Sequence, residues 1–427
     1  MAERTKNSRP NVKWRSDFDK FVVTANCERR GWQKWIPEDG GDDWHLYWAS
    51  VQTVKQIFLP ENGIRLDPWQ LVNHFPNHYE LTRKDLMVKN LKRYQKTMKK
   101  EGADTSSLDF IPVTYILPQD YSLFVEEFRK QPNSMWIMKP TSRSQGKGIF
   151  LFNKLSQVKK WAAGQMPSSA KTAENYVVSK YIENPLLIGG KKFDLRLYVV
   201  VCSYRPLKAY ISDLGFARFC NEKYSSEVQE IDNLYVHLTN VAIQKHGETY
   251  NERHGNKWPL QNLETYIAGT RGSDACRRLL SRIDFVVLSA LKACQNVMIN
   301  DRHCFELYGF DVILDEELKP WLIEVNASPS LSASTRADRL LKTKVIHDTL
   351  SVVCPAQWLS PGFNPGGKKE QSNPASGKVE DEVSTATPKR LGSLRLLCDE
   401  TPSMEAQRVR RDEAVSAGPH RTARTRP

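Results

Sequence analysis

Two carboxylates and one amide interrupt the otherwise apolar runs of the segment YGFDVILDEELKPWLIEVNASPS. Asp311 lies in the first run, and Glu324 and Asn326 lie in the second. Side chains alternate along a strand, so Glu324 and Asn326 share a face, and a turn between Glu317 and Leu318 would place Asp311 opposite Glu324. Such oxygen donors suit Mg²⁺. An edge strand with a polar face toward water is the alternative, but we interpret the hairpin as a magnesium site.

A second candidate site is the loop in MWIMKPTSRSQGKGIFLF. An apolar strand would end at Lys139, and a polar loop with Gly146, Lys147 and Gly148 precedes the next apolar run. Glycine lets the backbone approach a phosphate closely, and lysine neutralises its charge. The loop matches neither a P-loop nor a dinucleotide-binding turn, because GxxxxGK[ST] and GxGxxG are both missing. It is therefore a candidate phosphate loop of another type.

A third element, KKFDLRLYVVV, combines charge with strand periodicity. Lys192, Asp194 and Arg196 are two residues apart and would project from one face, while apolar residues alternate with them on the other face. A strand with one face in water would look the same. Next to a phosphate loop and a magnesium hairpin, we interpret the charged face as the floor of a nucleotide site. Arg196 could reach a γ-phosphate, and Asp194 could orient a lysine or a ribose.

The composition restricts the class of protein that positions these residues. The 427 residues carry a formal net charge of +13 and are 40% hydrophobic, so we expect a globular α/β protein with an acidic partner. We expect no membrane span and no secretory signal, because no apolar run is long enough. The eight cysteines show no zinc-like spacing and are expected to be reduced. His74 and His78 are separated by Pro76, which disfavours a shared zinc ion.

Four regions follow from the pattern along the chain. Residues 1–110 are expected to form a tryptophan-rich lobe, 111–190 a central lobe and 191–360 a C-terminal lobe, and 361–427 read as a disordered polar tail. The apolar pattern predicts strands at 135–138, 149–152, 176–182, 195–201, 305–314 and 320–326, and helices at 273–299 and 335–353. This alternation of strands and helices is typical of an α/β fold.

The stretch from Arg83 to Lys100 holds eight basic residues and one acid, and its apolar residues have helical spacing. One interpretation is an ordinary solvated helix face. The other is a docking surface for an acidic partner, formed by Lys89, Lys92, Arg93 and Lys96. Nucleic acid is disfavoured as that partner, because the run has few aromatics and no nucleic-acid motif is present.

Taken in their order along the chain, the three elements resemble those of the ATP-grasp fold. The sequence resembles the tubulin tyrosine ligase-like family, and within it the short polyglutamylases. The resemblance extends over about residues 30–350, and its motifs are NHFPNHYELTRKDLMVKN, WIMKP with QGKGI, KFDLRLYV, HLTNVAIQK, GFDVILD and WLIEVNASPSL. It implies an N-terminal, a central and a C-terminal catalytic lobe, with ATP and Mg²⁺ as cofactors.

The resemblance also implies roles for individual residues. Those expected to contact ATP are Lys139, Gln145, Gly146, Lys180, Tyr181, Ile182, Glu183, Lys192, Phe193, Asp194, Thr239 and Asn240. Arg196, Lys192 and Asp194 are the expected catalytic residues, and Gln145 is also expected to meet the protein substrate. The expected metal ligands are Asp311, Glu324 and Asn326.

Substrate and partners are implied in the same way. The resemblance places Arg218 and Lys257 near the incoming amino acid, where two cations suit free L-glutamate, and glycine stays an alternative. Tubulin or microtubules are the expected protein substrate, modified through an acylphosphate. The expected location is the cytoplasm and cytoskeleton, in the axoneme and basal body of cilia or flagella.

Large members of the family carry a long cationic extension after the catalytic core, and this chain has only a short polar tail there. Accessory subunits or the basic stretch 83–100 are therefore expected to supply microtubule binding. Two alternatives stay open. One is a ligase for another acidic protein. The other is a non-catalytic microtubule-binding protein, which the complete set of Asp311, Glu324 and Asn326 disfavours.

Overall fold

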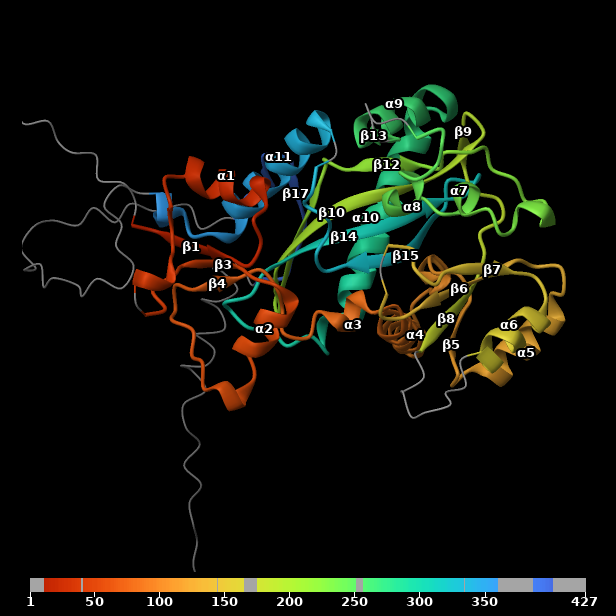
Figure 1. Cartoon of the computed structure of the whole chain (residues 1–427), viewed down its shortest axis with the longest axis horizontal. Helices are drawn as coiled ribbons and strands as arrows, with labels where there is room; N and C mark the ends of the chain where they lie inside the picture. Colours follow the sequence, from red (N-terminus) through yellow and green to blue (C-terminus); the bar gives the residue numbers. More distant parts are fainter. Residues whose placement is uncertain are drawn as a thin grey trace, which may run out of the picture.

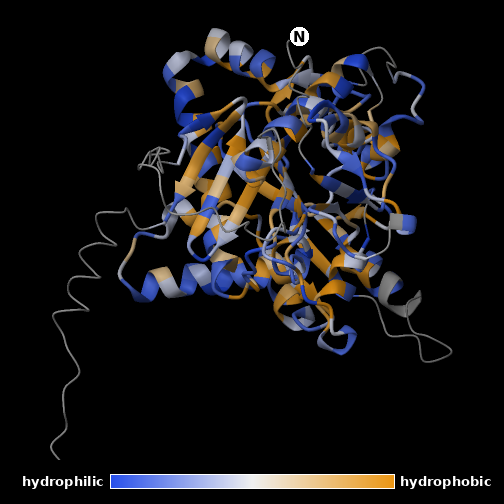
Figure 2. Ribbon diagram, turned by 90° about the vertical axis from the view of Figure 1, so that its left-hand side faces the viewer, coloured by the Kyte–Doolittle hydropathy of each residue, from blue (hydrophilic) through white to orange (hydrophobic). Residues whose placement is uncertain are grey.

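The computed structural model describes residues 11–39, 41–143, 145–164, 175–250, 256–333, 335–359 and 387–401. These residues form a mixed α/β structure with three sheets (Figure 1). Apolar residues follow the strands, and hydrophilic residues predominate on the outer helices (Figure 2). None of the described helices is both long and apolar enough to cross a bilayer.

The N-terminal region has a parallel sheet in the order β2-β1-β3-β4. Its strands are β1 (Lys13–Ser16), β2 (Gln33–Lys34), β3 (Leu46–Trp48) and β4 (Leu71–Val72), and its helices are α1 (Phe21–Arg29), α2 (Val51–Ile57), α3 (Tyr79–Thr82) and α4 (Lys84–Lys100). Trp14, Trp32 and Trp48 pack in one buried cluster with Val345 and Leu350 of α11 (Arg336–Val353). The N-terminal region therefore shares its core with a helix from far along the chain, which lies beside α1 in Figure 1.

The central region has an antiparallel sheet in the order β5-β8-β6-β7. Its elements are β5 (Thr114–Leu117), α5 (Tyr121–Lys130), β6 (Trp136–Pro140), β7 (Phe150–Phe152), α6 (Leu155–Gly164) and β8 (Tyr176–Lys180). Strand alternation divides β6 between two environments. Trp136 and Met138 pack against Phe124 and Phe128 of α5, while Ile137 lines a pocket on the opposite face.

The largest sheet contains β9 (Leu187–Ile188), β10 (Lys191–Tyr204), β11 (Leu207–Ser212), β12 (Phe216–Phe219), β13 (Lys257–Pro259), β14 (Glu306–Leu314) and β15 (Pro320–Asn326). The helices α7 (Leu234–His237), α8 (Val241–Gln244), α9 (Leu260–Arg271) and α10 (Ser273–Gln295) accompany it. Leu195 and Leu197 of β10 share a buried cluster with Leu263 of α9 and Ile283 and Val287 of α10. Because α9 and α10 cover this apolar face, the charged residues of β10 point the other way.

The strands and helices predicted from residue 135 onward are confirmed, with ends that differ by a few residues. The prediction of a wholly disordered tail is wrong for residues 387–401. There, β16 (Arg390–Leu391) and β17 (Leu394–Asp399) form a hairpin, and β17 pairs with β11. Leu394 is fully buried, and Ser393 donates a backbone and a hydroxyl hydrogen bond to Asp348 of α11. The rest of the predicted tail lies outside the described residues.

His74 and His78 have separate partners. His74 Nδ1 lies 2.5 Å from Glu306 Oε1, and His78 Nδ1 lies 3.0 Å from Thr82 Oγ1. Within the described ranges, no group of three His, Cys, Asp or Glu side chains could hold a metal ion. The eight cysteines are free thiols.

Candidate active site

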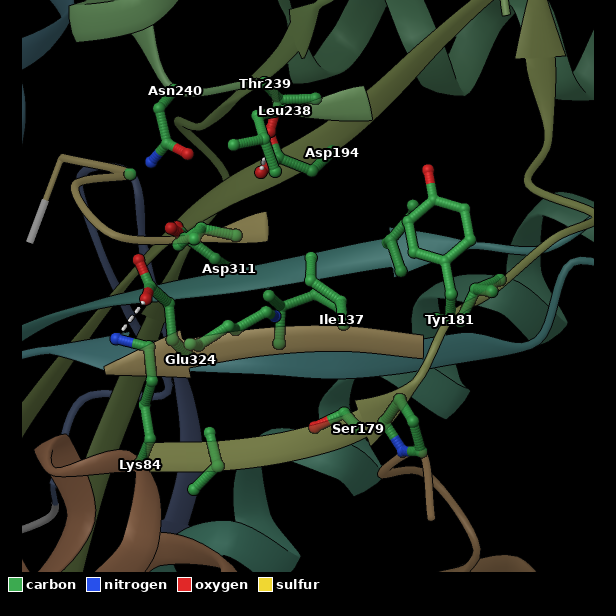
Figure 3. Close-up of a pocket in the computed structure, with 18 of the residues that line it drawn as sticks. Lys84, Ile137, Ser179, Tyr181, Asp194, Leu238, Thr239, Asn240, Asp311 and Glu324 are labelled. Atoms are coloured by element: carbon green, nitrogen blue, oxygen red, sulfur yellow. Dashed lines mark hydrogen bonds and ion pairs between the residues drawn. The ribbon is translucent and has the colours of Figure 1, made fainter. Parts of the chain in front are cut away.

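A pocket lies between the central sheet, the charged face of the largest sheet, the first turns of α4 and the segment that joins α7 to α8 (Figure 3). The residues predicted to contact ATP or metal that line this pocket are Lys139, Gln145, Gly146, Lys180, Tyr181, Ile182, Lys192, Asp194, Thr239, Asn240, Asp311 and Glu324. The fold therefore places around one cavity residues that the sequence predicted to share a site, although they come from separate sheets.

The hairpin of β14 and β15 has the predicted register. Asp311 pairs with Glu324, and Gly309 pairs with Asn326. Asn326 Nδ2 lies 3.4 Å from Asp311 Oδ2 and 3.5 Å from Glu324 Oε1, so the three side chains converge. A β-bulge after Asp311 locally changes the spacing of the two strands.

Protein cations neutralise both carboxylates of this hairpin. Arg196 donates two hydrogen bonds to Asp311, from Nε at 2.6 Å and from Nη2 at 3.0 Å. Lys84 Nζ lies 2.8 Å from Glu324 Oε2. Burial opposes ionisation of Glu324, but Lys84 and Lys139 outweigh it and hold the pKa of its carboxyl well below the usual range. A converging pair of carboxylates next to an amide fits the donor chemistry of Mg²⁺.

Lys84 is a site residue that sequence reasoning missed, because it was grouped with the basic surface stretch. Lys84 is 9% exposed, and Figure 3 shows its ammonium bridged to Glu324. Its position was readable from helical spacing. Lys84, Met87, Val88 and Leu91 lie three, four and seven residues apart, which places Lys84 on the apolar face of α4.

The phosphate loop depends on backbone conformations that most residues avoid. Gln145, Gly146 and Gly148 have φ values of 64°, 77° and 76°. The positive φ of Gly146 favours glycine, and a Cβ there would also displace the end of the Ile243 side chain on α8. Strained non-glycine residues such as Gln145 are concentrated at functional sites.

Lys139, at the end of β6, places a half-buried cation in the pocket beside this loop. Among the described residues it forms no hydrogen bond and no ion pair, although it lines the pocket. Burial lowers the pKa of Lys139 to about 8. Glu324 and Asp311 act electrostatically on this ammonium but form no ion pair with it, so a phosphate in the pocket would supply a direct anionic partner.

A hydrogen-bond relay forms the inner end of the pocket. Lys192 Nζ donates to Tyr181 Oη at 2.7 Å and to the His237 carbonyl at 2.9 Å, and Tyr181 Oη lies 3.0 Å from His237 Nδ1. Burial lowers the pKa of Lys192 to about 8 and that of His237 to about 4. His237 is a second residue that sequence reasoning missed, since nothing in the local pattern ties it to Tyr181.

Two of the predicted hinge residues direct their side chains elsewhere. Lys180 Nζ donates to Gln131 Oε1 at 2.6 Å, and Glu183 Oε1 accepts from the Met135 backbone at 2.8 Å. Glu183 does not line the pocket. Any contact of these residues with a ligand would therefore come from the backbone.

Four further predicted residues, Arg196, Arg218, Lys257 and Asn326, lie behind the pocket wall and do not line it. Together with three wall residues they form a charged row across five strands, whose members are Lys257, Arg218, Asp194, Arg196, Asp311, Glu324 and Asn326. Arg218 holds Asp194 at 2.7 and 2.6 Å and also lies 2.9 Å from Asp311. Thr239 Oγ1 completes the contacts of Asp194 at 2.6 Å. This row fixes the orientation of the acidic residues that face the cavity.

Phe193 is not part of the pocket. It is 1% exposed, and its ring lies 5.1 Å from that of Phe219 in the core on the opposite face of the sheet. Alternation along β10 excludes it, because its neighbours Lys192 and Asp194 face the cavity. Any contact of Phe193 with the nucleotide would therefore come from its backbone.

Lys257 lies at one end of the charged row, next to α11. Lys257 Nζ is 3.0 Å from Asp338 Oδ2, and Lys342 Nζ is 3.1 Å from the same oxygen. Burial lowers the pKa of Lys342 to about 8 in spite of Asp338. Two ammonium groups thus share one carboxylate, which leaves positive charge at this end of the row. Sequence reasoning missed Lys342 and Asp338, because α11 follows the motifs that it used.

Residues 63–359 match the model of the tubulin-tyrosine ligase family. The chain is 48% identical over 401 residues to the probable alpha-tubulin polyglutamylase Ttll1 of Tetrahymena thermophila, which covers 91% of this chain and 93% of that protein. It is 42% identical over 381 residues to the probable tubulin polyglutamylase TTLL9 of Rattus norvegicus, with 82% and 81% covered. It is also 36% identical to tubulin polyglutamylase TTLL5 of Mus musculus, over 92% of this chain and 30% of that protein. The chain belongs to the tubulin-tyrosine ligase family.

Proposed function

We propose that this protein is an ATP-dependent ligase that adds glutamate to glutamate side chains in the C-terminal tails of tubulin. The observation that carries the proposal is the convergence of Asp311, Glu324 and Asn326 near Lys139, a half-buried cation that forms no direct ion pair among the described residues. Mg²⁺ would bind at the three converging side chains, and the phosphates of a nucleoside triphosphate would pair with Lys139. The relatives named polyglutamylases support the choice of substrate.

The arrangement of the sheets supports an ATP-grasp architecture. The antiparallel sheet with β6 and β8 forms one wall of the pocket, and β10, β14 and β15 form the other. The adenine would lie near Tyr181 and Ile182, and the phosphates would extend toward Lys139 and the loop at Gly146. Two walls from separate sheets allow the protein to enclose ATP and exclude water.

Mg²⁺, when bound, would neutralise phosphate charge and help to align the phosphates. Asp311, Glu324 and Asn326 are the residues that would hold it. Lys84 keeps Glu324 ionised, and Arg196 orients Asp311 through two hydrogen bonds, so both carboxylates are positioned before the nucleotide arrives.

The proposed reaction has two steps. A side-chain carboxylate of the protein substrate attacks the γ-phosphorus of ATP, which forms an acylphosphate and releases ADP. The amino group of free glutamate then attacks the acyl carbon, which forms an isopeptide bond and releases inorganic phosphate and a proton. The chain contributes positioning and charge neutralisation, with Lys139 on the phosphate side and Arg196 behind the pocket wall, where it holds Asp311.

The distribution of charge also favours glutamate as the incoming amino acid. The charges of Arg196 and Arg218 are balanced by Asp194 and Asp311, whereas Lys257 and Lys342 pair with one carboxylate, that of Asp338, among the described residues. The excess cation would meet a carboxylate of the substrate. Glutamate brings two carboxylates and glycine brings one, so glycine would form fewer contacts with the cations at this end of the row.

Microtubules would be the form of tubulin that is modified, with accessory subunits that assist binding, and the axoneme and basal body of cilia or flagella are the proposed location. Glycylation and ligation to another acidic protein are the competing functions.

The test is a parallel incorporation assay. Purified protein is incubated with ATP, Mg²⁺ and microtubules and with labelled glutamate, glycine or tyrosine. We expect label from glutamate alone. Preferential incorporation of glycine would show that glutamate is not the incoming amino acid. Incorporation into another acidic protein but not into tubulin would show that tubulin is not the acceptor.

A further inference from the structure

A groove between α1 and α11 combines positive charge with exposed apolar surface. Its cations are Arg29 on α1 and Arg336, Arg339 and Lys344 on α11, all of them exposed. The described residues that line it include no aspartate and no glutamate. Within the described chain, Arg29, Arg336 and Arg339 form no ion pair. The groove therefore carries uncompensated positive charge.

Two large apolar side chains lie among these cations. Phe21 on α1 is 57% exposed, and Leu340 on α11 is 62% exposed. The Arg339 guanidinium lies 5.8 Å from the centre of the Phe21 ring, so one cation contacts the apolar surface directly. Isolated apolar residues on a surface need no explanation, but Phe21 and Leu340 line the same groove.

The two walls of the groove are fixed to each other. Asn26, which is fully buried, donates to the Thr343 carbonyl at 2.9 Å, and Arg30 donates to the His347 carbonyl at 2.7 Å. Val345 and Ile346 anchor the opposite side of α11 in the core. A rigid groove loses little conformational entropy when a ligand binds.

Helix α11 links the groove to the amino-acid end of the charged row. Asp338 lies between Arg336 and Arg339 in the sequence of α11, but it is buried and holds Lys257 at 3.0 Å and Lys342 at 3.1 Å. One turn of α11 therefore directs two arginines into the groove. The carboxylate of Asp338 in the same turn points to Lys257, at the amino-acid end of the charged row. A chain that enters the site could continue across this turn.

We infer that the groove between α1 and α11 binds an acidic segment of the protein substrate, and that an apolar side chain of this segment packs against Phe21 and Leu340. The identity of that substrate rests on the proposed function, whereas the preference for an acidic peptide rests on the groove alone. Arg29, Arg336 and Arg339 contact the carboxylates, which raises the local concentration of acceptor side chains at the site.

The first experiment measures peptide binding without catalysis. A fluorescein-labelled poly-glutamate peptide with a central phenylalanine is titrated with the full chain, and anisotropy gives the Kd. We expect the Arg336→Glu/Arg339→Glu variant to bind about tenfold more weakly or worse. The matched control, Arg278→Glu/Arg282→Glu, changes the charge equally on the exposed face of α10 and should bind as wild type does. Equal weakening in both variants, or none in either, overturns the inference.

The apolar contact has its own variants. Phe21→Ser/Leu340→Ser should weaken binding of the phenylalanine peptide but leave binding of an all-glutamate peptide unchanged. Ile299→Ser, which removes another exposed apolar side chain, is the control. Thermal melting of each variant establishes that it is folded. If a single-stranded RNA binds more tightly than the peptide and loses affinity in Arg336→Glu/Arg339→Glu, the peptide assignment is wrong.

A ligation assay separates this inference from the proposed function. With microtubules, Arg336→Glu/Arg339→Glu should raise KM about tenfold at similar kcat, and with a minimal acceptor peptide too short to reach the groove KM should be unchanged. If wild type ligates glutamate and the variant has an unchanged KM for microtubules, the groove inference fails alone. If wild type binds the acidic peptide through the groove but ligates nothing, the proposed function fails alone.

Discussion

At the scale of single residues, the contact between Lys84 and Glu324 explains how a half-buried carboxylate can remain ionised. Lys84 offsets the burial that opposes ionisation and, with other cations, keeps the pKa of Glu324 well below its usual range. Lys84→Met should raise this pKa, because burial would then be less opposed. If ionised Glu324 is required, the acidic limb of the profile of kcat/KM against pH should move to higher pH. Lys84→Arg keeps the charge and should move it less. An acidic limb that is unchanged in Lys84→Met would contradict the role of Lys84.

Glu324→Gln tests the metal assignment itself. The amide preserves shape but removes a charge, so we expect loss of ligation by about a hundredfold or more and weaker binding of Mg²⁺ with ATP. The cost in stability should stay within about 1–3 kcal/mol, since Lys84 loses its anion. Glu317→Gln, in the exposed turn of the same hairpin, is the control. Calorimetric titration and a turnover assay measure the two effects, and wild-type turnover by folded Glu324→Gln would end the magnesium assignment.

The lowered pKa of Lys139 should make ATP binding depend on pH. Burial lowers its pKa to about 8, so the protonated form that attracts phosphate is lost from the free protein as the pH rises through that value. The affinity for ATP should therefore fall from pH 7 to pH 9, by up to about tenfold for this lysine. Lys139→Arg, whose guanidinium does not titrate there, should bind ATP with a flatter profile. The same steep decline in both proteins would show that another group is responsible.

How much of the site could be predicted depends on whether its contacts are local in sequence. Asp311 and Glu324 lie in one hairpin, where strand alternation and one turn decide the register. The pairing of Arg218 with Asp194 and the sharing of Asp338 by Lys257 and Lys342 depend on the order of strands in the sheet and on a helix from beyond the motifs. No local pattern encodes such contacts, so sequence reasoning placed the cations near the substrate but missed the anions that hold them.

At the scale of elements, α4 has both a site function and a surface. Its buried face carries Lys84, and its exposed face includes Lys89 and Lys96. Lys92, predicted to be part of a docking surface, donates to the Thr114 carbonyl at 2.7 Å and lies 5.5 Å from the Tyr115 ring. Lys92 therefore attaches α4 to β5, and a test of docking should leave it unchanged.

Arg93 donates to Asn90 Oδ1 at 2.8 Å and is also left unchanged, so the docking prediction is tested at Lys89 and Lys96. We expect Lys89→Glu/Lys96→Glu to raise KM for microtubules, with an effect that weakens at high salt because exposed charges are screened beyond ~8 Å at physiological ionic strength. ATP affinity should be unchanged. Lys159→Glu/Lys160→Glu on α6 is the matched control, since both side chains are exposed there. If both variants have the same KM as wild type, the exposed face of α4 is an ordinary solvated surface.

The hairpin of β16 and β17 shows why a segment judged by average polarity was mispredicted. The polar residues around LRLL lower the mean hydropathy, yet Leu394 alone is fully buried and β17 covers the edge of β11. Leu394→Asp should destabilise the protein by about 3 kcal/mol or more, because an unpaired carboxylate would be buried. Lys389→Asp, at an exposed position before β16, should change the free energy of unfolding little. Urea unfolding compares them, and equal stability of the two variants would contradict a structural role for the hairpin.

At the scale of the whole molecule, distant parts of the chain are joined around one cavity. The tryptophan cluster of the N-terminal region includes residues of α11, and α11 in turn holds Lys257 through Asp338. The pocket takes its walls from the central sheet, the largest sheet and α4. Periodicity predicted most of these elements, but the shared core follows from tertiary packing, for which the sequence offers no local signal.

The central claim is that the pocket forms an isopeptide bond between glutamate and a tubulin tail at the expense of ATP. The most direct measurement is tandem mass spectrometry of tubulin tails after incubation with the protein, ATP, Mg²⁺ and isotopically labelled glutamate. The account predicts labelled glutamate attached to side-chain carboxylates of the tails, with ADP formed in step, and no product with Glu324→Gln. Label attached only at the C-terminal α-carboxylate, or wild-type product with Glu324→Gln, would contradict it.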